Sequence, residues 1–475
     1  MAETEPETPA DRARIGITGE GERRRPATCL GHHPRDGELS SSHLGSRTVK
    51  PSFLLLVVDC LRADTVARPH RAWPETSRLI GDAASFGSAY TTCPTTSPAF
   101  TSMLTGRYPA AHGVRALRGS ALPDSVPSVA EELENAGYRT WCSVTGPLLD
   151  SVGLFRGFQV ADYRDVPRRS VHSPWGDDAV ATVRELSAGD RPFFALVHVW
   201  DVHTPRSYPR SFDRRRYGKN AYERSLAGID AWVGRMREAA GDALVILTGD
   251  HGENLFLEPP GLRWQGLARR ITRRLPIQSW SLAMLERGVS SDSKRLLRLA
   301  PRYFWNHNQT LLESLVHVPL AFAGPGVATG ARREPVSHVD LAPTLLELAG
   351  LPQPALGWQG TSLAGSVRTG VEPPSHPVAM EVGITPGVPT VPQQAIRDGR
   401  WKLSTSLEDA RVVDALYDLD ADPGERHNLA RAHPDVVARL RERLEQLATE
   451  SVEAAPMADE DEAILTARLE ELGYL

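Results

Sequence analysis

The sequence has few cysteines and no long apolar run. Its 475 residues contain only four cysteines: Cys29, Cys60, Cys93 and Cys142. Four cysteines in so long a chain do not make a disulfide scaffold, and the absence of a C-x-x-C pair excludes a structural zinc knot. The longest apolar run, 53–58, is too short to span a bilayer, and the first residues lack the apolar stretch of a secretory signal. We therefore expect a cytoplasmic protein without a transmembrane segment.

The charge is nearly balanced, and few of the basic residues are lysines. Lys and Arg together number 54 against 59 Asp and Glu, which gives a net charge of -5. A dedicated nucleic-acid-binding protein is normally clearly basic, so we expect no nucleic-acid partner. Hydrophobic residues make up 41% of the chain, enough for a large packed core. The length predicts about three domain units, or one large α/β domain with an appendage.

The composition predicts three parts. Residues 1–49 are rich in Gly, Pro and Ser without periodicity, which is typical of a disordered leader. Residues 50–370 alternate short apolar runs with amphipathic segments, which predicts a mostly parallel central sheet flanked by helices. Residues 371–475 turn to Pro-rich loops and short strands, and they end in two amphipathic helices near 433–450 and 458–472. The predicted strands of the larger part are 53–59, 138–144, 193–201, 243–250 and 318–324.

A basic insert interrupts the larger part at residues 255–305. It holds ten Arg or Lys against three acidic residues, with tryptophans and leucines interleaved. The pattern favours a solvated helical lid with aliphatic contacts to the body of the protein. The alternative is a surface that meets anionic lipid head groups, which would allow peripheral membrane contact, or that steers an anionic substrate.

Three of the predicted strands end in residues of the types that commonly bind metals. Asp59 closes the first strand, Asp201 and His203 follow the third, and Asp250 with His251 closes the fourth. In an open α/β sheet the carboxyl ends of the strands line one edge, where ligands bind. A single Asp at a strand end is more often a cap or a loop hydrogen-bond acceptor, but three such ends favour a divalent ion. Oxygen and imidazole ligands suit Mn²⁺, Zn²⁺, Mg²⁺ or Ca²⁺.

The segment 91–114 contains a candidate nucleophile. Thr96 and Ser97 precede Pro98, which is well placed in the first turn of a helix. A hydroxyl at a helix N-terminus lies where unpaired N–H groups can hold an anion. The same pattern is equally consistent with Thr96 or Ser97 acting only as an N-cap.

Six segments of the chain, in this order, match the motifs of a known family: 59–64, 96–113, 247–253, 310–326, 337–351 and 416–430. In these segments the chain resembles the sulfatases, which belong to the alkaline phosphatase superfamily. The resemblance runs in order from residue 52 to about 432, and it implies an α/β core, a smaller C-terminal antiparallel sheet and a buried divalent metal.

The resemblance also implies roles for single residues. Asp59 and Asp250 match metal ligands of the family, and His251 stands where sulfatases often have Asn or Gln. Thr96 occupies the position of the nucleophile, which also contacts the metal. His203 matches the histidine of the H-x-P motif, which contacts the substrate oxyanion.

Two further assignments extend this set. His307 falls near a basic substrate-binding position, with a loose alignment because of the insert. A second metal site is also possible, and it would consist of Asp201, His203 and His307. In the alternative, the two histidines contact the substrate and bind no metal.

The departures from the family pattern concern the same site. Formylglycine forms from Cys or Ser followed by x-Pro-x-Arg, whereas Thr96 is followed by Ser-Pro-Ala-Phe100. Threonine cannot yield the aldehyde, so we expect no formylglycine. The second Asp of the usual Asp-Asp pair is Cys60, and the G-K-x-H stretch is missing from 143–149. Threonine nucleophiles are found in the phosphodiesterases of this superfamily.

We therefore expect a metal-dependent hydrolase that cleaves a phosphate or sulfate ester through Thr96, with a phosphoester slightly favoured. Its substrate would be a small-molecule, lipid-linked or glycan-linked anionic ester. The alternatives are a sulfuric ester hydrolase that works without formylglycine, a phosphoryl-group transferase, and an inactive anion-binding pseudoenzyme.

Overall fold

The structure is a computed structural model of the chain. It describes residues 50–472 apart from 167, 256–257, 263, 265–309, 355–356, 384–391, 410–411 and 448–450. The predicted leader 1–49, most of the insert 255–305 and the candidate residue His307 lie outside the described residues. Within the described residues, no helix is both long enough and apolar enough to cross a membrane.

A nine-stranded, mostly parallel sheet forms the centre of the fold. Eight strands follow the order β4-β3-β5-β1-β6-β7-β2-β8, and β9 pairs with β2. The five strands from β4 to β6 are parallel, and β7 runs antiparallel to both of its neighbours. The strands are β1 (Phe53–Val58), β2 (Ala84–Tyr90), β3 (Arg139–Thr145), β4 (Val160–Arg164), β5 (Phe193–Val199), β6 (Leu244–Gly249), β7 (His317–Ala323), β8 (Gly330–Arg332) and β9 (Val336–Ser337).

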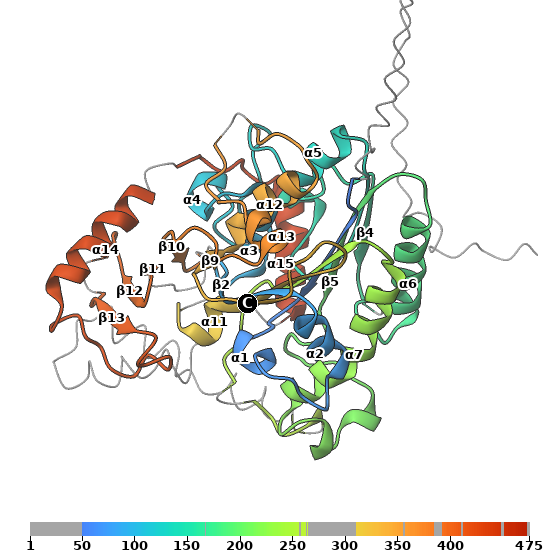
Figure 1. The fold of residues 1–475 in the computed structure, drawn as a ribbon, viewed down its shortest axis with the longest axis horizontal. Helices are drawn as coiled ribbons and strands as arrows, with labels where there is room; N and C mark the ends of the chain where they lie inside the picture. The colour runs from blue at the N-terminus through green and yellow to red at the C-terminus, as the bar shows by residue number, and fades with distance from the viewer. Residues whose placement is uncertain are drawn as a thin grey trace, which may run out of the picture. The chain divides into compact units, whose positions relative to one another are not determined.

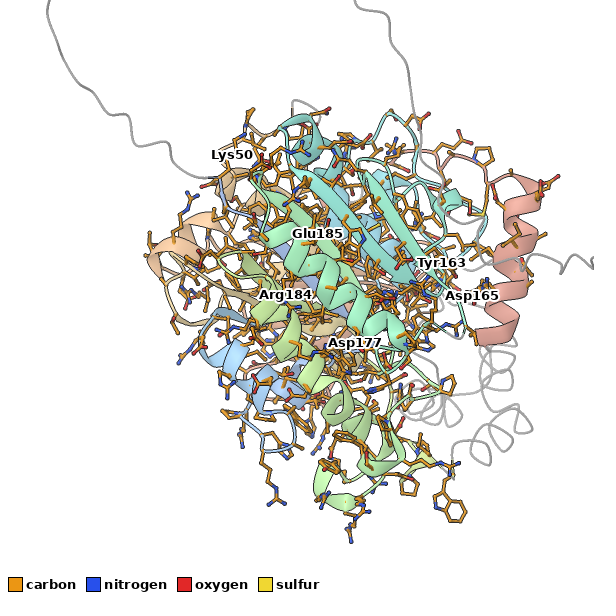
Figure 2. The ribbon with its side chains drawn as sticks, turned by 90° about the vertical axis from the view of Figure 1, so that its right-hand side faces the viewer. Lys50, Tyr163, Asp165, Asp177, Arg184 and Glu185 are labelled. Atoms are coloured by element: carbon orange, nitrogen blue, oxygen red, sulfur yellow. The ribbon has the colours of Figure 1, made fainter. Side chains whose placement is uncertain are left out.

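Helices cover both faces of this sheet. All six residues of β1 are buried, and they alternate between two hydrophobic clusters on opposite faces. One cluster includes residues of α2 (Pro74–Gly81), α6 (Pro174–Ser187) and α7 (Ala221–Ala239). Figure 2 shows α6 lying across this face, with Asp177, Arg184 and Glu185 labelled on it. The other cluster includes residues of α3 (Thr96–Thr105), α5 (Val129–Asn135), α12 (Leu341–Leu348), α13 (Ala364–Thr369) and α15 (Asp459–Leu472).

The short helices lie mainly in the loops around these layers. Four-residue α-helices and single 3-10 turns replace longer irregular connections. They are α1 (Ala63–Val66), α4 (Pro109–His112), α11 (Glu313–Val316), η2 (Asp150–Val152), η3 (Arg210–Phe212), η4 (Arg215–Tyr217) and η6 (His338–Asp340).

A separate antiparallel sheet follows in the C-terminal part of the chain. Its strands, in order, are β10 (Val378–Glu381), β11 (Gln394–Asp398), β12 (Trp401–Thr405) and β13 (Ala415–Asp418). The helix α14 (Pro434–Leu447) packs on this sheet through Leu440 and Leu444, whereas α15 belongs to the core of the large sheet (Figure 1). The α/β fold class, with its smaller antiparallel sheet, is thereby confirmed. The division into a domain 50–370 and a subdomain 371–475 stays a prediction.

A buried lysine joins the two sheets. Nζ of Lys402, on β12, donates to the carbonyl of Leu311 at 2.6 Å and lies 2.8 Å from Glu313 and 2.9 Å from Glu425. Glu313 begins α11, which leads directly into β7 of the large sheet. The side chain of Lys402 is fully buried, so its charge is balanced by these two carboxylates and not by water.

Replacing this lysine should destabilise the protein strongly. Lys402→Met leaves Glu313 and Glu425 buried without a cation, and we expect a loss of about 3–5 kcal/mol in the free energy of unfolding. Lys219→Met is the matched control, because Lys219 pairs with Glu223 at the surface with its side chain 77% exposed. The free energy of unfolding of this control should fall by less than about 1 kcal/mol. Urea unfolding of both variants measures the difference, and equal losses would contradict the role of Lys402.

Candidate active site and metal centre

The strand register brings the predicted ligands to one edge of the sheet. Val58, the last residue of β1, pairs with Val199 of β5 on one side and with Gly249 of β6 on the other. The residues that follow these strands therefore leave the sheet at the same level. Asp59 and Asp250 are the first of them, both fully buried. This is the carboxyl edge at which parallel sheets bind ligands.

The two carboxylates face each other with one oxygen each lacking a hydrogen bond. Oδ2 of Asp59 lies 3.2 Å from Nε2 of His198, and Oδ1 of Asp250 accepts from the backbone N–H groups of Cys60 (3.1 Å) and His251 (2.8 Å). Oδ1 of Asp59 and Oδ2 of Asp250 have no hydrogen-bond partner among the described residues. A buried carboxylate oxygen without a partner is costly, unless a cation binds it.

Burial and neighbouring charges shift the protonation of this group. Burial disfavours the charged form of Asp59, but the charge of His203 and the hydrogen bond from His198 outweigh it and lower the pKa of Asp59. Burial and the charge of Asp59 raise the pKa of Asp250. Burial lowers the pKa of His251, but the two carboxylates outweigh it and raise that pKa overall. One carboxylate is held ionised and the other resists ionisation, as expected for two facing acids.

These residues fit a divalent metal ion. Ligand atoms of Asp59, His198 and Asp250 all lie within 4.8 Å of one another, and all three residues are buried. Two unpartnered carboxylate oxygens beside imidazole groups form a donor set that suits Mn²⁺ or Zn²⁺ and accepts Mg²⁺ or Ca²⁺. His198 was not among the residues predicted for the site. A histidine inside the apolar strand FFALVHV could have pointed to it. Its place at the site follows only from the pairing of β5 with β1.

The hydrogen bonds of His251 determine which nitrogen faces the site. Nδ1 lies 2.8 Å from the carbonyl of Gly252, which can only accept, so Nδ1 carries the hydrogen. In the neutral ring Nε2 then presents its lone pair. It lies 3.4 Å from Oγ1 of Thr96 and 3.5 Å from Oδ2 of Asp250. His251 can therefore bind a cation together with the carboxylate, or accept a hydrogen from the threonine.

Thr96 lies inside the first turn of α3 and is not its N-cap. The N-cap is Thr95, whose side chain makes no capping hydrogen bond, so the N-cap interpretation of Thr96 and Ser97 is wrong. Pro98 occupies the third helical position, where its missing N–H is not needed. The Thr96 side chain is buried and turns toward His251. Unpaired N–H groups at the start of this ten-residue helix favour an anionic group beside it.

His203 and Asp201 follow β5 but lie in different surroundings. The ring of His203 stacks on Trp200 with centroids 4.1 Å apart, and its backbone N–H donates to the carbonyl of Trp200 at 2.8 Å. Both carboxylate oxygens of Asp201 accept hydrogen bonds, one from the hydroxyl of Ser170 and one from the backbone N–H of Val171 at 3.0 Å. Asp201 is absent from the described groups with metal-ligand spacing, and it anchors a loop instead.

Comparisons with known proteins agree with this fold. A family model described as Sulfatase matches residues 51–351, and one described as N-sulphoglucosamine sulphohydrolase, C-terminal, matches residues 302–450. The fold with its carboxylate pair is of the alkaline phosphatase type. The chain belongs to the sulfatase family, as the sequence resemblance predicted.

Individual relatives match over part of their length. The chain is 25% identical over 327 residues to a Delta 4,5-hexuronate-2-O-sulfatase of Bacteroides thetaiotaomicron, which covers 67% of this chain and 53% of that enzyme. The fold of this chain is similar to that of a 2-O GAG sulfatase. The TM-score is 0.61 at 21% identity, and the match covers 86% of this chain and 95% of the other. A phosphonate monoester hydrolase of Agrobacterium radiobacter has a TM-score of 0.60, 18% identity and coverage of 85% and 96%. The chain spans about half the length, or less, of the first curated relatives that it matches.

The carboxylate pair predicts opposite effects of one substitution with and without metal. Asp250→Asn removes a charge that faces Asp59, and its amide can donate to Nε2 of His251, so the metal-free protein should melt at a higher temperature. The same variant should lose the stabilisation by Mn²⁺, which for the unmodified protein reaches about 2.7 kcal/mol at one hundred times Kd. Thermal melts with and without Mn²⁺ measure both effects.

Asp201→Asn is the matched control for this experiment. Asp201 also follows a strand of the same edge, but both of its oxygens are occupied by loop hydrogen bonds. The control should melt at a lower temperature and keep its response to Mn²⁺. A Mn²⁺ response that is lost in Asp201→Asn and kept in Asp250→Asn would contradict the assignment of the metal centre.

Proposed function

We propose that this protein is a metal-dependent hydrolase that cleaves a phosphate ester by nucleophilic attack of Thr96. The observation that carries the proposal is the position of the Thr96 hydroxyl. It lies at the start of α3, 3.4 Å from Nε2 of His251, beside the buried pair Asp59 and Asp250. Thr96 is the first residue of α3, so its hydroxyl has no helical carbonyl one turn earlier to bond, in contrast to that of Thr101, which bonds to Ser97.

The residues at this edge of the sheet would bind a metal ion and orient the nucleophile. Asp59, Asp250, His251 and Thr96 would hold a divalent ion. When bound, the ion polarises the ester oxygen and lowers the pKa of the threonine hydroxyl. The carboxylates hold the ion, and the Nδ1 hydrogen bond of His251 keeps its Nε2 aimed at the same point.

The reaction would proceed in two displacements. Oγ1 of Thr96, its proton released to water, bonds to phosphorus while the bond from phosphorus to the alcohol oxygen breaks. His203 stabilises the leaving oxygen and donates a proton to it. Water then cleaves the phospho-threonine and restores the hydroxyl. His307, proposed for the same oxyanion, lies outside the described residues.

Two side chains favour phosphoryl over orthodox sulfatase chemistry. Thr96 cannot be converted to the aldehyde on which formylglycine sulfatases depend. The arginine of the conversion motif is replaced by Phe100, whose ring packs edge-on against His198 with centroids 4.9 Å apart and is buried. This position therefore serves packing of the metal edge. No formylglycine is part of the proposed mechanism.

A sulfate ester is the second candidate substrate. The family assignment favours it, because the relatives found by sequence are named as sulfatases, one of them for a hexuronate 2-O-sulfate. The same attack by Thr96 would then give a sulfo-threonine. A glycan-linked or small-molecule ester is the substrate class that fits either chemistry.

Removing the nucleophile tests the proposal. Thr96→Ala should lower kcat/KM for an aryl phosphodiester by a thousandfold or more, on the order seen when a nucleophile is removed. Thr96→Ser should keep measurable turnover, because it retains a hydroxyl. Assays with Mn²⁺ or Zn²⁺ on a phosphodiester, a phosphomonoester and a sulfate ester identify the preferred chemistry, and mass spectrometry of the quenched enzyme detects the modified threonine.

Thr105→Ala is the control for the helix. The hydroxyl of Thr105 bonds to the carbonyl of Thr101 on the same helix, two turns from the site, and its loss should leave kcat/KM close to that of the unmodified protein. A Thr96→Ala protein that binds metal and turns over esters normally would exclude Thr96 as the nucleophile. If neither the unmodified protein nor any variant turned over any of these esters, the pseudoenzyme alternative would be favoured.

A further inference from the structure

A second group of metal-type side chains lies beside the carboxylate pair and shares Asp59 with it. A carboxylate oxygen of Asp59, Sγ of Cys60 and a ring nitrogen of His203 all lie within 4.8 Å of one another, and all three residues are buried. A tetrahedral zinc ion with ligands at about 2.0–2.3 Å holds such atoms about 3.3–3.8 Å apart. Small rotations of these side chains would therefore bring them to ligand distance.

The backbone holds the Cys60 thiol in this position. Cys60 has a φ of +60°, in the left-handed region that non-glycine residues avoid. Its N–H donates to Oδ1 of Asp250, and its carbonyl accepts from the hydroxyl of Tyr222 at 2.9 Å. These hydrogen bonds keep the residue in a conformation that directs Sγ toward the metal edge. There Sγ makes one weak hydrogen bond, to Glu253 at 3.8 Å.

Asp59 and His203 place their ligand atoms close to this thiol. Oδ2 of Asp59 is occupied by His198, which leaves the fully buried Oδ1 with no hydrogen-bond partner among the described residues. This one oxygen has two lone pairs, so it could be shared between an ion in the Asp59–Asp250 site and a second ion. The imidazole of His203 is held by its stacking on Trp200, at an interplanar angle of 29°.

We propose that Asp59, Cys60 and His203 form a second cation site that selects Zn²⁺ and adjoins the Asp59–Asp250 site. Thiolate and imidazole are ligands that zinc prefers, whereas Mg²⁺ and Ca²⁺ take oxygen. On binding, the thiol loses its proton to water and sulfur bonds to the ion. Three protein ligands leave the fourth position open for water or a substrate oxygen, as in catalytic zinc sites.

The proposal deepens the proposed function and rests on it only for the role of His203. With an ion bound here, His203 would hold the ion, and the ion would supply the stabilisation of the leaving oxygen. The ligand set differs from the expected Asp201, His203 and His307, because Asp59 and Cys60 replace two members. The oxygens of Asp201 are used by its loop, and His307 lies outside the described residues.

Metal content and the cobalt spectrum test the site without substrate. The full-length protein, stripped of metal and dialysed against Zn²⁺, should retain two equivalents by mass spectrometry of the metal. Loaded with Co²⁺, it should show a thiolate-to-cobalt charge-transfer band in the near ultraviolet. Cys60→Ser should lose the band and one equivalent of Zn²⁺. Asp250→Asn should lose the other equivalent and keep the band, because asparagine still accepts the N–H of Cys60.

Two other cysteines provide the controls. Cys142→Ser removes a buried thiol on β3, and Cys29→Ser removes a thiol outside the described residues. Both variants should keep two equivalents and the band. A single equivalent in the unmodified protein, or a band that survives Cys60→Ser, would overturn the proposal. In that case Cys60 serves only as a hydrogen-bond donor to Glu253. No turnover is measured, so this outcome is independent of whether Thr96 is the nucleophile.

Discussion

Two acids that face each other in a dry environment are the constraint around which this edge of the protein is arranged. Asp59 and Asp250 are fully buried at the ends of adjacent parallel strands, where their charges repel and water cannot screen them. Backbone N–H groups satisfy one oxygen of Asp250, and His198 satisfies one of Asp59. A divalent cation would satisfy the remaining oxygens. The imidazoles, the start of α3 and the loop after β5 all converge on the space where it would lie.

The sheet makes this arrangement rigid. Every residue of β1, β5 and β6 is buried, so these strands offer no side chain to water along their length. Apart from His198 inside β5, the functional groups follow the ends of the strands. Clusters on both faces prevent the strands from sliding, because a shift of one residue would exchange the side chains of the two faces. The distance between the two carboxylates is therefore determined by the register of β1 and β6.

The sequence predicted the residues that depend on local pattern and missed those that depend on strand order. Short buried runs that end in Asp are legible, so Asp59 and Asp250 could be assigned to one edge before the structure was known. The role of His198 could not, because it requires that β5 lie next to β1. Asp201 looked equivalent to Asp59, but the loop that returns to it occupies both of its oxygens. The left-handed backbone of Cys60 likewise depends on hydrogen bonds to Asp250 and Tyr222, far away in the chain.

Three of the positions at which this chain departs from the family pattern lie together at this edge of the sheet. Cys60 donates its N–H to Asp250, His251 lies against both Asp250 and Thr96, and Thr96 faces the same space. Each of these three replaces a group expected of a sulfatase, either with a softer donor or with a hydroxyl that cannot become an aldehyde. Sulfur and nitrogen ligands shift the preference of a site from Ca²⁺ and Mg²⁺ toward Zn²⁺. An ion of that kind activates a hydroxyl at neutral pH more strongly than Ca²⁺ does, and the proposed threonine nucleophile would need this activation. The proposed nucleophile and the proposed donor set would then be two parts of one chemical change.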